Sequence, residues 1–391
     1  MTGRADTALR ILVTGGGTGG HTYPALAIIR ALQDRYAGVG QQVQVLWVGV
    51  RDGLEARVAA DEQIAFHAVT TGKLRRSPNR RELAANLTDA FRIPVGIGQA
   101  LRVVARFRPD VVVSTGGYAA VPTGIAGWLL RRRVVMHEQT LGVGLANRIL
   151  ARVADRVLLS HDTSLSHLPR RARHRAAVTG NPIRPMAGDR GLAALSLSAQ
   201  LPLVLVTGGA QGARQINQML ATVLPELLDR CQVVHQTGAG GLDTMRAVAA
   251  ELDPALAGRY RPVAYLSDEL ADVLAAADLV IARAGAGTVA ELTAVGKAMV
   301  LIPLIPTDGD EQRRTARHLS DHGAAVMLAG ADATAPRLGE TVLGLLANPD
   351  RRKAMAANAA RLGHRDAADR VVDELVALLR HPGLADAPTQ R

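Results

Sequence analysis

A strand, a glycine-rich turn and the start of a helix occur twice in this chain. Residues 11–20 read ILVTGGGTGG and residues 204–213 read VLVTGGAQGA, with six of ten positions identical. Each copy joins an apolar, strand-like run to a helix-like stretch, and this junction is typical of a Rossmann-like sheet. Two copies 193 residues apart therefore predict two Rossmann-like domains in tandem. The alternative is a chance similarity between two glycine-rich junctions.

The rest of the chain fits an α/β fold class. Short apolar runs such as DVVVSTGG, LVLVTGG and AMVLIPL alternate with helix-like stretches. This alternation predicts parallel sheets covered by helices on both faces. Gly, Asn and Pro cluster in VTGNPIRPMAGDRG, which marks the join between domains. The predicted domains are residues 1–184 and 185–367, and we expect a C-terminal helix over residues 368–391 to pack back on the first domain.

Composition excludes several classes of protein. The chain of 391 residues has one cysteine, Cys231, so neither a disulfide framework nor a cysteine-based metal site is expected. The first ten residues lack the apolar run of a signal peptide, and no run of about 18 apolar residues predicts a membrane span. The sequence therefore predicts a soluble cytoplasmic protein.

The positive charge lies mainly in the first half. The net charge is +11, and residues 1–184 contain 26 Lys and Arg against 12 Asp and Glu. Such a surface attracts an anionic bilayer, a phosphorylated acceptor or nucleic acid. Nucleic acid is disfavoured, because no binding motif is present and aromatic residues make up only 3% of the chain. An arginine-biased composition without a partner is the alternative.

One basic stretch is a candidate membrane contact. In residues 71–109 the spacing of apolar residues predicts an amphipathic helix. Its apolar residues are Leu74, Leu83, Leu87, Phe91 and Ile93, and its flanking basic residues are Arg75, Arg76, Arg80 and Arg81. Docking on an anionic leaflet and an ordinary surface helix both explain this pattern.

The glycine-rich turns predict binding of an anion. Glycine lets backbone N–H groups approach a phosphate closely, and the helix that follows adds its positive end. Gly15, Gly17 and Gly20 satisfy the dinucleotide pattern GxGxxG, but the acidic residue expected about 20 positions later is missing. Two such turns facing a cleft fit a nucleotide-sugar site better than an oxidoreductase.

A third glycine turn, over residues 284–288, opens another helix. It offers backbone amides for a diphosphate, and Glu291 lies one turn inside the helix, where a carboxylate can accept both hydroxyls of a ribose. Compensation of the helix dipole is the alternative role for Glu291. Asp310, Glu311 and Gln312 follow the next strand, so we expect them at the same edge of the sheet.

His21 is the candidate general base. It follows the first glycine turn at a helix N-terminus, where the positive helix end disfavours the imidazolium form. A neutral imidazole there can take a proton from an attacking hydroxyl. A capping or packing histidine is the alternative.

Several motifs in order resemble the MurG family, the UDP-N-acetylglucosamine transferases that convert lipid I to lipid II in peptidoglycan synthesis. The matching segments are GGGTGGHTYPALAI, TGGYAAVPTGIAGW, HEQT with the following ANR, VTGNPIRP, GGAQGARQIN, ARAGAGTVAELTAVGKAMVLIPL and DEQRRTA. The resemblance implies a two-domain GT-B fold, an inverting mechanism and no tightly held metal or other cofactor. It also implies a UDP-sugar donor in the second domain, a polyprenyl-diphosphate-linked acceptor in the first, and a peripheral location on the cytoplasmic face of the cell membrane.

The resemblance also implies site residues. The catalytic residue is His21. The donor-binding residues are Thr18, Gly19, Gly20, Thr140, Arg184, Ala210, Gln211, Gly212, Leu266, Ala286, Gly287, Thr288, Glu291 and Gln312. The acceptor-binding residues are Gly16, Gly17, Gly116, Gly117, Tyr118 and Glu138. A hinge ion pair is the alternative role for Arg184, and a plain turn is the alternative for residues 116–118. His137 and Glu138 are expected to orient the cleft wall rather than to bind a metal.

Three positions depart from the family pattern. The family usually has Asn after HEQ, Ser in GGSQGAR and Asn three residues after the glutamine of EQ, where this chain has Thr140, Ala210 and Thr315. The lost amides and hydroxyl can read the donor sugar, so a MurG-like glycosyltransferase of a secondary-metabolite or phosphoglycolipid pathway, using another UDP-sugar or acceptor, is an alternative. A non-catalytic sugar-nucleotide-binding scaffold and a UDP-sugar epimerase are further alternatives. The oligomeric state is left open.

Overall fold

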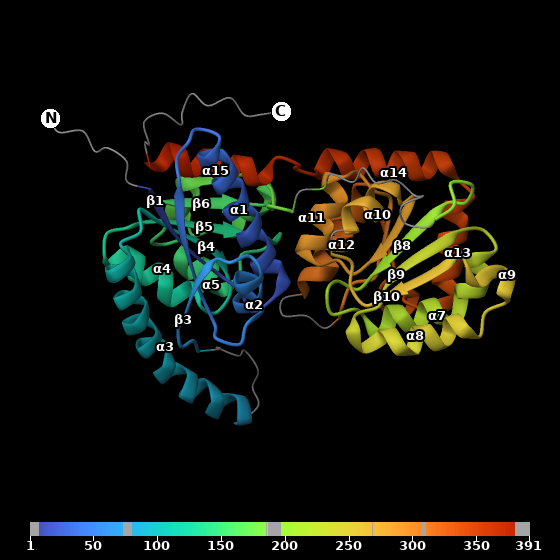
Figure 1. The fold of residues 1–391 in the computed structure, drawn as a ribbon, viewed down its shortest axis with the longest axis horizontal. Coiled ribbons are helices and arrows are strands. Elements are labelled where there is room, and N and C mark those ends of the chain that lie inside the picture. Colours follow the sequence, from blue (N-terminus) through green and yellow to red (C-terminus); the bar gives the residue numbers. More distant parts are fainter. Residues whose placement is uncertain are drawn as a thin grey trace. The chain divides into compact units, whose positions relative to one another are not determined.

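The computed structural model describes residues 8–72, 80–184, 186, 197–267, 269–305 and 310–379, with side chains omitted for residues 80–91. The chain divides into two compact units. Unit 1 comprises residues 1–184 and 366–391, and unit 2 comprises residues 185–365. Each unit is a parallel sheet between layers of helices (Figure 1). The chain therefore leaves unit 1 after Arg184 and returns to it at Asp366.

Unit 1 contains a seven-stranded sheet in the order β3-β2-β1-β4-β5-β6-β7, with all neighbours parallel. The strands are β1 (Leu9–Gly15), β2 (Val43–Gly49), β3 (Ala65–Ala68), β4 (Val111–Gly116), β5 (Arg133–Glu138), β6 (Arg156–Leu159) and β7 (Ala176–Val178). The helices are α1 (Gly19–Ala37), α2 (Leu54–Asp61), α3 (Arg80–Phe107), α4 (Ala120–Leu129), α5 (Leu145–Leu150) and α15 (Ala367–Leu379), with 3₁₀ turns at Asp162–His167 and Arg170–Arg175.

Unit 2 contains a six-stranded parallel sheet in the order β10-β9-β8-β11-β12-β13. The strands are β8 (Leu203–Thr207), β9 (Gln232–Gln236), β10 (Tyr260–Val263), β11 (Leu279–Ala282), β12 (Met299–Leu301) and β13 (Ala325–Met327). The helices are α7 (Arg214–Leu228), α8 (Leu242–Ala250), α9 (Pro254–Ala257), α10 (Leu270–Ala276), α11 (Ala286–Ala294), α12 (Glu311–Asp321), α13 (Ala335–Leu346) and α14 (Pro349–Leu362), with 3₁₀ turns at Ala239–Gly241 and Gly330–Asp332.

The central strands are buried on both faces, which explains their continuous apolar sequences. In unit 1, Ile11 and Val13 of β1 pack in one core layer with α1 and α15, while Leu12 packs in the other with α3 and α4. In unit 2, Val204 and Val206 of β8 face a layer formed by α7 and α13, and Leu205 faces the layer of α10, α11 and α12. The two glycine junctions of the sequence repeat follow β1 and β8, each of which is the third strand from one edge of its sheet.

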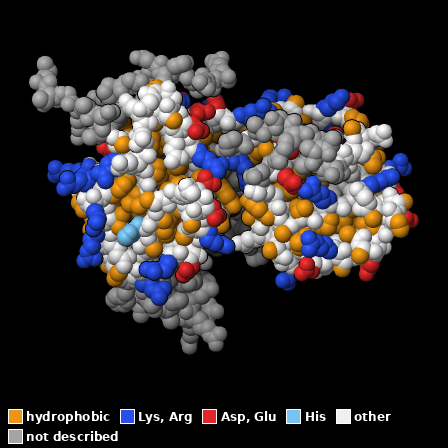
Figure 2. Space-filling view, viewed as in Figure 1, with side chains coloured by type: hydrophobic (Ala, Val, Ile, Leu, Met, Phe, Trp, Pro, Cys, Tyr) orange, Lys and Arg blue, Asp and Glu red, His pale blue; other side chains and the backbone are white. Residues whose placement is uncertain are grey.

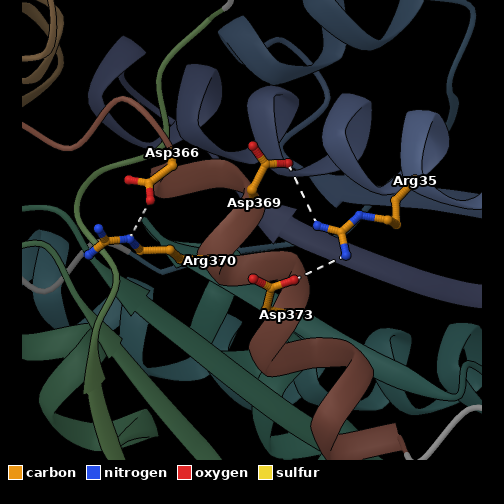
Figure 3. Close-up of polar contacts among 5 residues, drawn as sticks. All are labelled: Arg35, Asp366, Asp369, Arg370 and Asp373. Carbon is orange, nitrogen blue, oxygen red and sulfur yellow. Dashed lines mark hydrogen bonds and ion pairs between the residues drawn. The ribbon is translucent and has the colours of Figure 1, made fainter. Parts of the chain in front are cut away.

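Helix α15 belongs to unit 1 although it follows unit 2 in sequence. Val371, Val372, Leu375 and Val376 join the core layer of α1. Next to this contact, Arg35 of α1 pairs with Asp373 at 3.1 Å and with Asp369 at 3.9 Å, while Arg370 of α15 pairs with Asp366, the residue before this helix (Figure 3). The expected helix over 368–391 is described as far as Leu379, and residues 380–391 lie outside the described part.

Candidate active site

The buried carboxylate of Glu55 packs against the first glycine turn of unit 1. Glu55 is fully buried, and its carboxylate accepts hydrogen bonds from the N–H groups of Gly17 and Val50, both at 2.9 Å. A Cβ on Gly16 would lie 2.1 Å from the Glu55 carboxyl carbon, so only glycine fits there. The N–H of Gly17 is therefore already used, whereas Gly19 and Gly20, as the first residues of α1, have N–H groups without intrahelical partners.

His21 is held by its Nδ1 atom. This nitrogen lies 2.8 Å from the carbonyl oxygen of Thr115 and 2.9 Å from Oε1 of Gln139. Both oxygens are acceptors, so Nδ1 carries a proton, and in the neutral imidazole the lone pair therefore lies on Nε2. Among the described residues, Nε2 has no hydrogen-bond partner. A histidine in this form has the basic nitrogen that general-base catalysis needs.

The turn after β4 packs directly against the first glycine turn. Gly116 and Gly117 have φ values of +99° and +89°, which favour glycine. A Cβ on Gly116 would lie 3.0 Å from two atoms of the His21 ring, and one on Gly117 would lie 2.3 Å from the carbonyl oxygen of Gly16. These glycines thus make room for His21 and for the first turn, while Tyr118 beside them is 43% exposed.

The HEQT segment forms a loop around Glu138. Oε1 of this carboxylate accepts from the N–H of Thr140 at 3.1 Å and from its hydroxyl at 2.8 Å. Oε2 accepts from the N–H of Gly144 and from Nδ2 of Asn147, both at 3.0 Å. Glu138 is 2% exposed, so its carboxylate orders the loop from inside. The Thr140 hydroxyl, at a position where the family pattern has an amide, is likewise bound within the loop.

The first glycine turn of unit 2 is held by neutral groups. Nε2 of Gln236 donates to the carbonyl oxygen of Gly209 at 2.8 Å, and its Oε1 accepts from the N–H of Leu266 at 2.9 Å. A Cβ on Gly212 would lie 1.9 Å from the carbonyl oxygen of Thr237, so this turn also needs glycine. Ala210 and Gln211 lie exposed at its tip.

The turn after β11 is open. No heavy atom of the described residues lies within 4 Å of a Cβ built on Gly285 or Gly287, and Ala286 begins α11. Behind the turn, Arg283 donates to Oε1 of Gln215 and to the carbonyl oxygen of Ile302, and burial lowers the pKa of this guanidinium. Thr288 and Glu291 are half-buried in α11.

The remaining predicted residues are also located. Oε1 of Gln312 accepts from the N–H of Leu304 at 2.9 Å, and Thr315 is buried in the same helix, α12. The Arg184 guanidinium lies 5.4 Å from the centre of the Tyr23 ring, against α1 of unit 1. Thr18 is exposed, and its carbonyl oxygen accepts from the N–H groups of His21 and Thr22 in α1.

The structure thus gathers the predicted residues in two groups. In unit 1, Gly16, Gly17, His21, Gly116 and Gly117 form one packed cluster. In unit 2, the turns at 208–213 and 284–288 follow the neighbouring strands β8 and β11. Sequence reasoning missed Glu55, Thr115 and Gln139. The only sequence signals for them were a glutamate close after the second strand and a polar residue at the end of the fourth and fifth strands.

In the described residues, no group of three or more His, Cys, Asp or Glu is arranged to hold a metal ion. No helix in the described part of the chain is long and apolar enough to span a bilayer. Of the basic amphipathic stretch, Leu74, Arg75 and Arg76 lie outside the described residues. The side chains of Arg80, Arg81, Leu83, Leu87 and Phe91 are likewise outside the description, although the backbone forms α3.

Comparison with known proteins defines the family. Residues 11–159 match the glycosyltransferase family 28 N-terminal domain, and residues 203–371 match the family 28 C-terminal domain. The chain is 38% identical over 377 residues to the UDP-N-acetylglucosamine–N-acetylmuramyl-(pentapeptide) pyrophosphoryl-undecaprenol N-acetylglucosamine transferase of Salinibacter ruber, covering 95% of this chain and 97% of that protein. It is 37% identical over 332 residues to the transferase of the same name from Treponema pallidum (strain Nichols), covering 84% of each chain. The crystal structure of Acinetobacter baumannii MurG superposes with a TM-score of 0.72 at 28% identity, covering 93% of this chain and 98% of that one. The two parallel sheets and these matches confirm the predicted GT-B fold. The chain belongs to glycosyltransferase family 28 and, within it, to the MurG family.

Proposed function

We propose that this chain transfers N-acetylglucosamine from UDP-N-acetylglucosamine to a lipid-linked acceptor, the reaction that converts lipid I to lipid II. The acceptor is the muramyl-(pentapeptide) pyrophosphoryl-undecaprenol in the names of its relatives. The observation that carries the proposal is the His21 imidazole, which has its Nδ1 proton fixed by two oxygens and Nε2 available as a base. A non-catalytic scaffold has no need of such an arrangement.

His21 would act on the acceptor. In an inverting transfer, the acceptor hydroxyl attacks the anomeric carbon from the face opposite UDP. The new carbon–oxygen bond forms as the bond to the phosphate oxygen breaks, and UDP leaves with the electron pair. Nε2 of His21 takes the hydroxyl proton, and the Thr115 and Gln139 oxygens on Nδ1 stabilise the resulting imidazolium.

Unit 2 would bind the donor. Its turn at residues 284–288 is open, and the amides at the start of α11 suit a diphosphate. Glu291 would accept the ribose hydroxyls, with further contacts from Gln211, Thr288 and Gln312. No tightly held metal is needed in this proposal, because the α11 N-terminus meets the charge that develops on UDP.

Unit 1 would hold the acceptor near His21. The Gly17 amide and the Glu138 carboxylate are engaged inside the protein, so they would shape the acceptor site rather than contact its diphosphate. The N–H groups of Gly19 and Gly20 and the exposed Tyr118 are better placed for that contact.

The proposed location is the cytoplasmic face of the cell membrane. Val95 of α3 and Trp128 and Leu129 of α4 are about half exposed, and the three arginines at residues 131–133 follow after Leu130. Hydrophobic side chains also lie among Lys and Arg side chains on the face drawn in Figure 2. Apolar side chains flanked by basic ones favour peripheral binding to an anionic leaflet.

Vesicle sedimentation tests this location. The double variant Trp128→Ser, Leu129→Ser should lose binding to vesicles containing phosphatidylglycerol. Arg351→Glu, an exposed basic site in unit 2, should bind as the parent does. Equal binding by all three proteins would contradict membrane docking through α4.

A transfer assay tests the reaction. Labelled UDP-N-acetylglucosamine and a soluble lipid I analogue should give labelled disaccharide product at a rate that His21→Ala lowers by roughly 10²–10⁴-fold. A panel of UDP-sugars addresses the second candidate, a related transfer of another sugar, which the departures at Thr140, Ala210 and Thr315 favour. Turnover with another sugar only would replace the first proposal by the second, and no turnover with any donor would support a scaffold.

A further inference from the structure

We propose that Gln139 and His137 are positioning residues that fix the ring proton of His21 on Nδ1 and so keep Nε2 as the basic nitrogen. This inference rests on the proposed role of His21 as the base. Three buried groups form one line of hydrogen bonds behind His21. Nδ1 of His21 meets Oε1 of Gln139 at 2.9 Å, Nε2 of Gln139 meets Nδ1 of His137 at 3.1 Å, and Nε2 of His137 meets the carbonyl oxygen of Gly180 at 2.8 Å.

The hydrogen bond between His137 and Gly180 decides which atoms of this line donate and which accept. The Gly180 carbonyl can only accept, so Nε2 of His137 carries a proton. Burial lowers the pKa of His137 to about 4, so at neutral pH its Nδ1 has a lone pair and accepts from Gln139. The Gln139 amide must therefore point its NH₂ group inward and its oxygen toward His21.

The backbone reinforces the same amide orientation. Nε2 of Gln139 also lies 3.1 Å from the carbonyl oxygen of His137. A reversed amide would place its oxygen against this carbonyl and its NH₂ group against the protonated Nδ1 of His21. Gln139 is 1% exposed and His137 is fully buried, so water cannot replace the lost partners.

The orientation of the Gln139 amide decides whether Nε2 of His21 can act as the base. If the Gln139 amide were reversed, Nδ1 of His21 would have to accept, and the proton would move to Nε2. Nε2 would then be a donor and could not take a proton from the acceptor. The Thr115 carbonyl, 2.8 Å from Nδ1, supports the productive form independently, so loss of Gln139 should weaken the preference rather than abolish it.

Three variants of the full chain separate positioning from stability. Gln139→Met keeps the length of the side chain and removes both hydrogen bonds. Gln139→Glu keeps an acceptor for His21 and loses the donor to His137. Gln232→Met is the matched control, because Gln232 is also buried and donates to two carbonyl oxygens. It is the first residue of β9 in unit 2 and is not part of the proposed site.

Two readouts are needed. The imidazole ¹⁵N shifts of His21, identified by comparison with His21→Ala, report which ring nitrogen carries the proton. The transfer assay gives kcat, and a titration gives the Kd of UDP-N-acetylglucosamine. In Gln139→Met we expect a mixture of the two ring forms and a kcat lower by about 10–100-fold, less than the ~10²–10⁴-fold contribution of a base itself, with Kd unchanged. In Gln139→Glu the Nδ1–H form and most of kcat should return, and Gln232→Met should match the parent in both readouts.

Failure of the positioning role of Gln139 and failure of His21 as the base would give different results. An unchanged Nδ1–H form in Gln139→Met, or an equal loss of kcat in Gln139→Glu and Gln139→Met, would overturn the positioning role. A shifted proton with unchanged kcat would leave the positioning role standing and would contradict His21 as the base. If Gln139→Met does not fold, the shifts and kcat of Gln139→Glu decide alone.

Discussion

The turns after β4 and β11 hold the same place in the two sheets, yet one is filled and the other is open. Each strand lies beside the strand of the first glycine turn, β1 in unit 1 and β8 in unit 2. In unit 1 the turn at Gly116–Gly117 is packed against His21 and Gly16. In unit 2 Gly285 and Gly287 face open space within the described part of the chain. The same topology therefore serves a fixed side chain in unit 1 and leaves room for a ligand in unit 2.

The side chains that hydrogen-bond the first glycine turn of each unit also differ in charge. In unit 1 the turn hydrogen-bonds Glu55, a carboxylate that follows β2, whereas in unit 2 it hydrogen-bonds Gln236, a neutral amide at the end of β9. Strands β2 and β9 occupy equivalent positions beside β1 and β8. A carboxylate beneath the turn disfavours a diphosphate at Gly17, whose N–H group it already binds. This contrast supports the proposal that the donor diphosphate binds unit 2, while the acceptor diphosphate contacts the N–H groups of Gly19 and Gly20 at the start of α1.

Matched glycine substitutions should give the largest contrast. Gly117→Ala places a Cβ 2.3 Å from a backbone oxygen at φ +89°, so it should lower the free energy of unfolding of unit 1 by roughly 2–4 kcal/mol. Gly285→Ala adds its Cβ in open space at φ −71°, so stability should change by less than about 0.5 kcal/mol. Gly285→Ala should instead weaken UDP-N-acetylglucosamine binding. Urea unfolding with hydrogen exchange and ligand titration check both, and equal stability losses would refute the filled-versus-open distinction.

Acid should weaken both units, because each buries a neutral histidine. Burial lowers the pKa of His137 in unit 1 and of His235 in unit 2, each to about 4. The unfolded chain titrates near 6.5 and binds more protons between pH 6.5 and 4, so this stability is complete above pH 6.5 and falls as the pH falls. The loss at pH 4.5 should be roughly 2–3 kcal/mol for each histidine. His235→Phe should flatten the pH dependence of unfolding in unit 2 alone, and an unchanged slope there would count against this assignment.

Changing the charge beneath the first turn should have a moderate effect. In Glu55→Gln one of the N–H groups of Gly17 and Val50 faces an NH₂ group, so unit 1 should lose about 1–3 kcal/mol. The Kd for UDP-N-acetylglucosamine should stay at the parent value. Thermal unfolding and calorimetric titration give the two numbers. A tighter donor Kd would mean that the donor diphosphate lies on the turn of unit 1.

The smallest effect should come from the ion pairs that join α15 to α1. Arg35→Ala removes the contacts to Asp369 and Asp373, whose carboxylates are about half exposed (Figure 3). The loss should be about 0.5–1 kcal/mol and should fall on unit 1, because the apolar contacts of α15 remain. Amide exchange in α15 and α14 measures this. Equal destabilisation of α14, in unit 2, would contradict the assignment of α15.

Local signals carried much of the fold prediction. The repeated strand–glycine–helix junction and the alternating apolar runs correctly predicted two parallel α/β sheets, because strands buried on both faces need continuous apolar sequence. The site was predicted less completely, since its supports are distant in sequence. Glu55 meets Gly17 across 38 residues, and Gln139 meets His21 across 118. No local pattern reports such contacts. Gly116 illustrates the same point. The sequence indicates a turn there, but it does not show that the His21 ring lies where a side chain at this position would be.

The roles of the two units are tested most directly by the Kd of UDP-N-acetylglucosamine for His21→Ala, measured beside its turnover. We assign the donor to unit 2 and the base to unit 1. His21→Ala should therefore bind the donor with the parent Kd while turnover falls by roughly 10²–10⁴-fold. Glu291→Gln is the reciprocal control, and it should weaken donor binding because a charge-assisted hydrogen bond is worth about 1.5–3 kcal/mol. A Kd that rises in His21→Ala as steeply as turnover falls would place His21 in donor binding. It would contradict the assignment of the donor to unit 2 and of the base to unit 1.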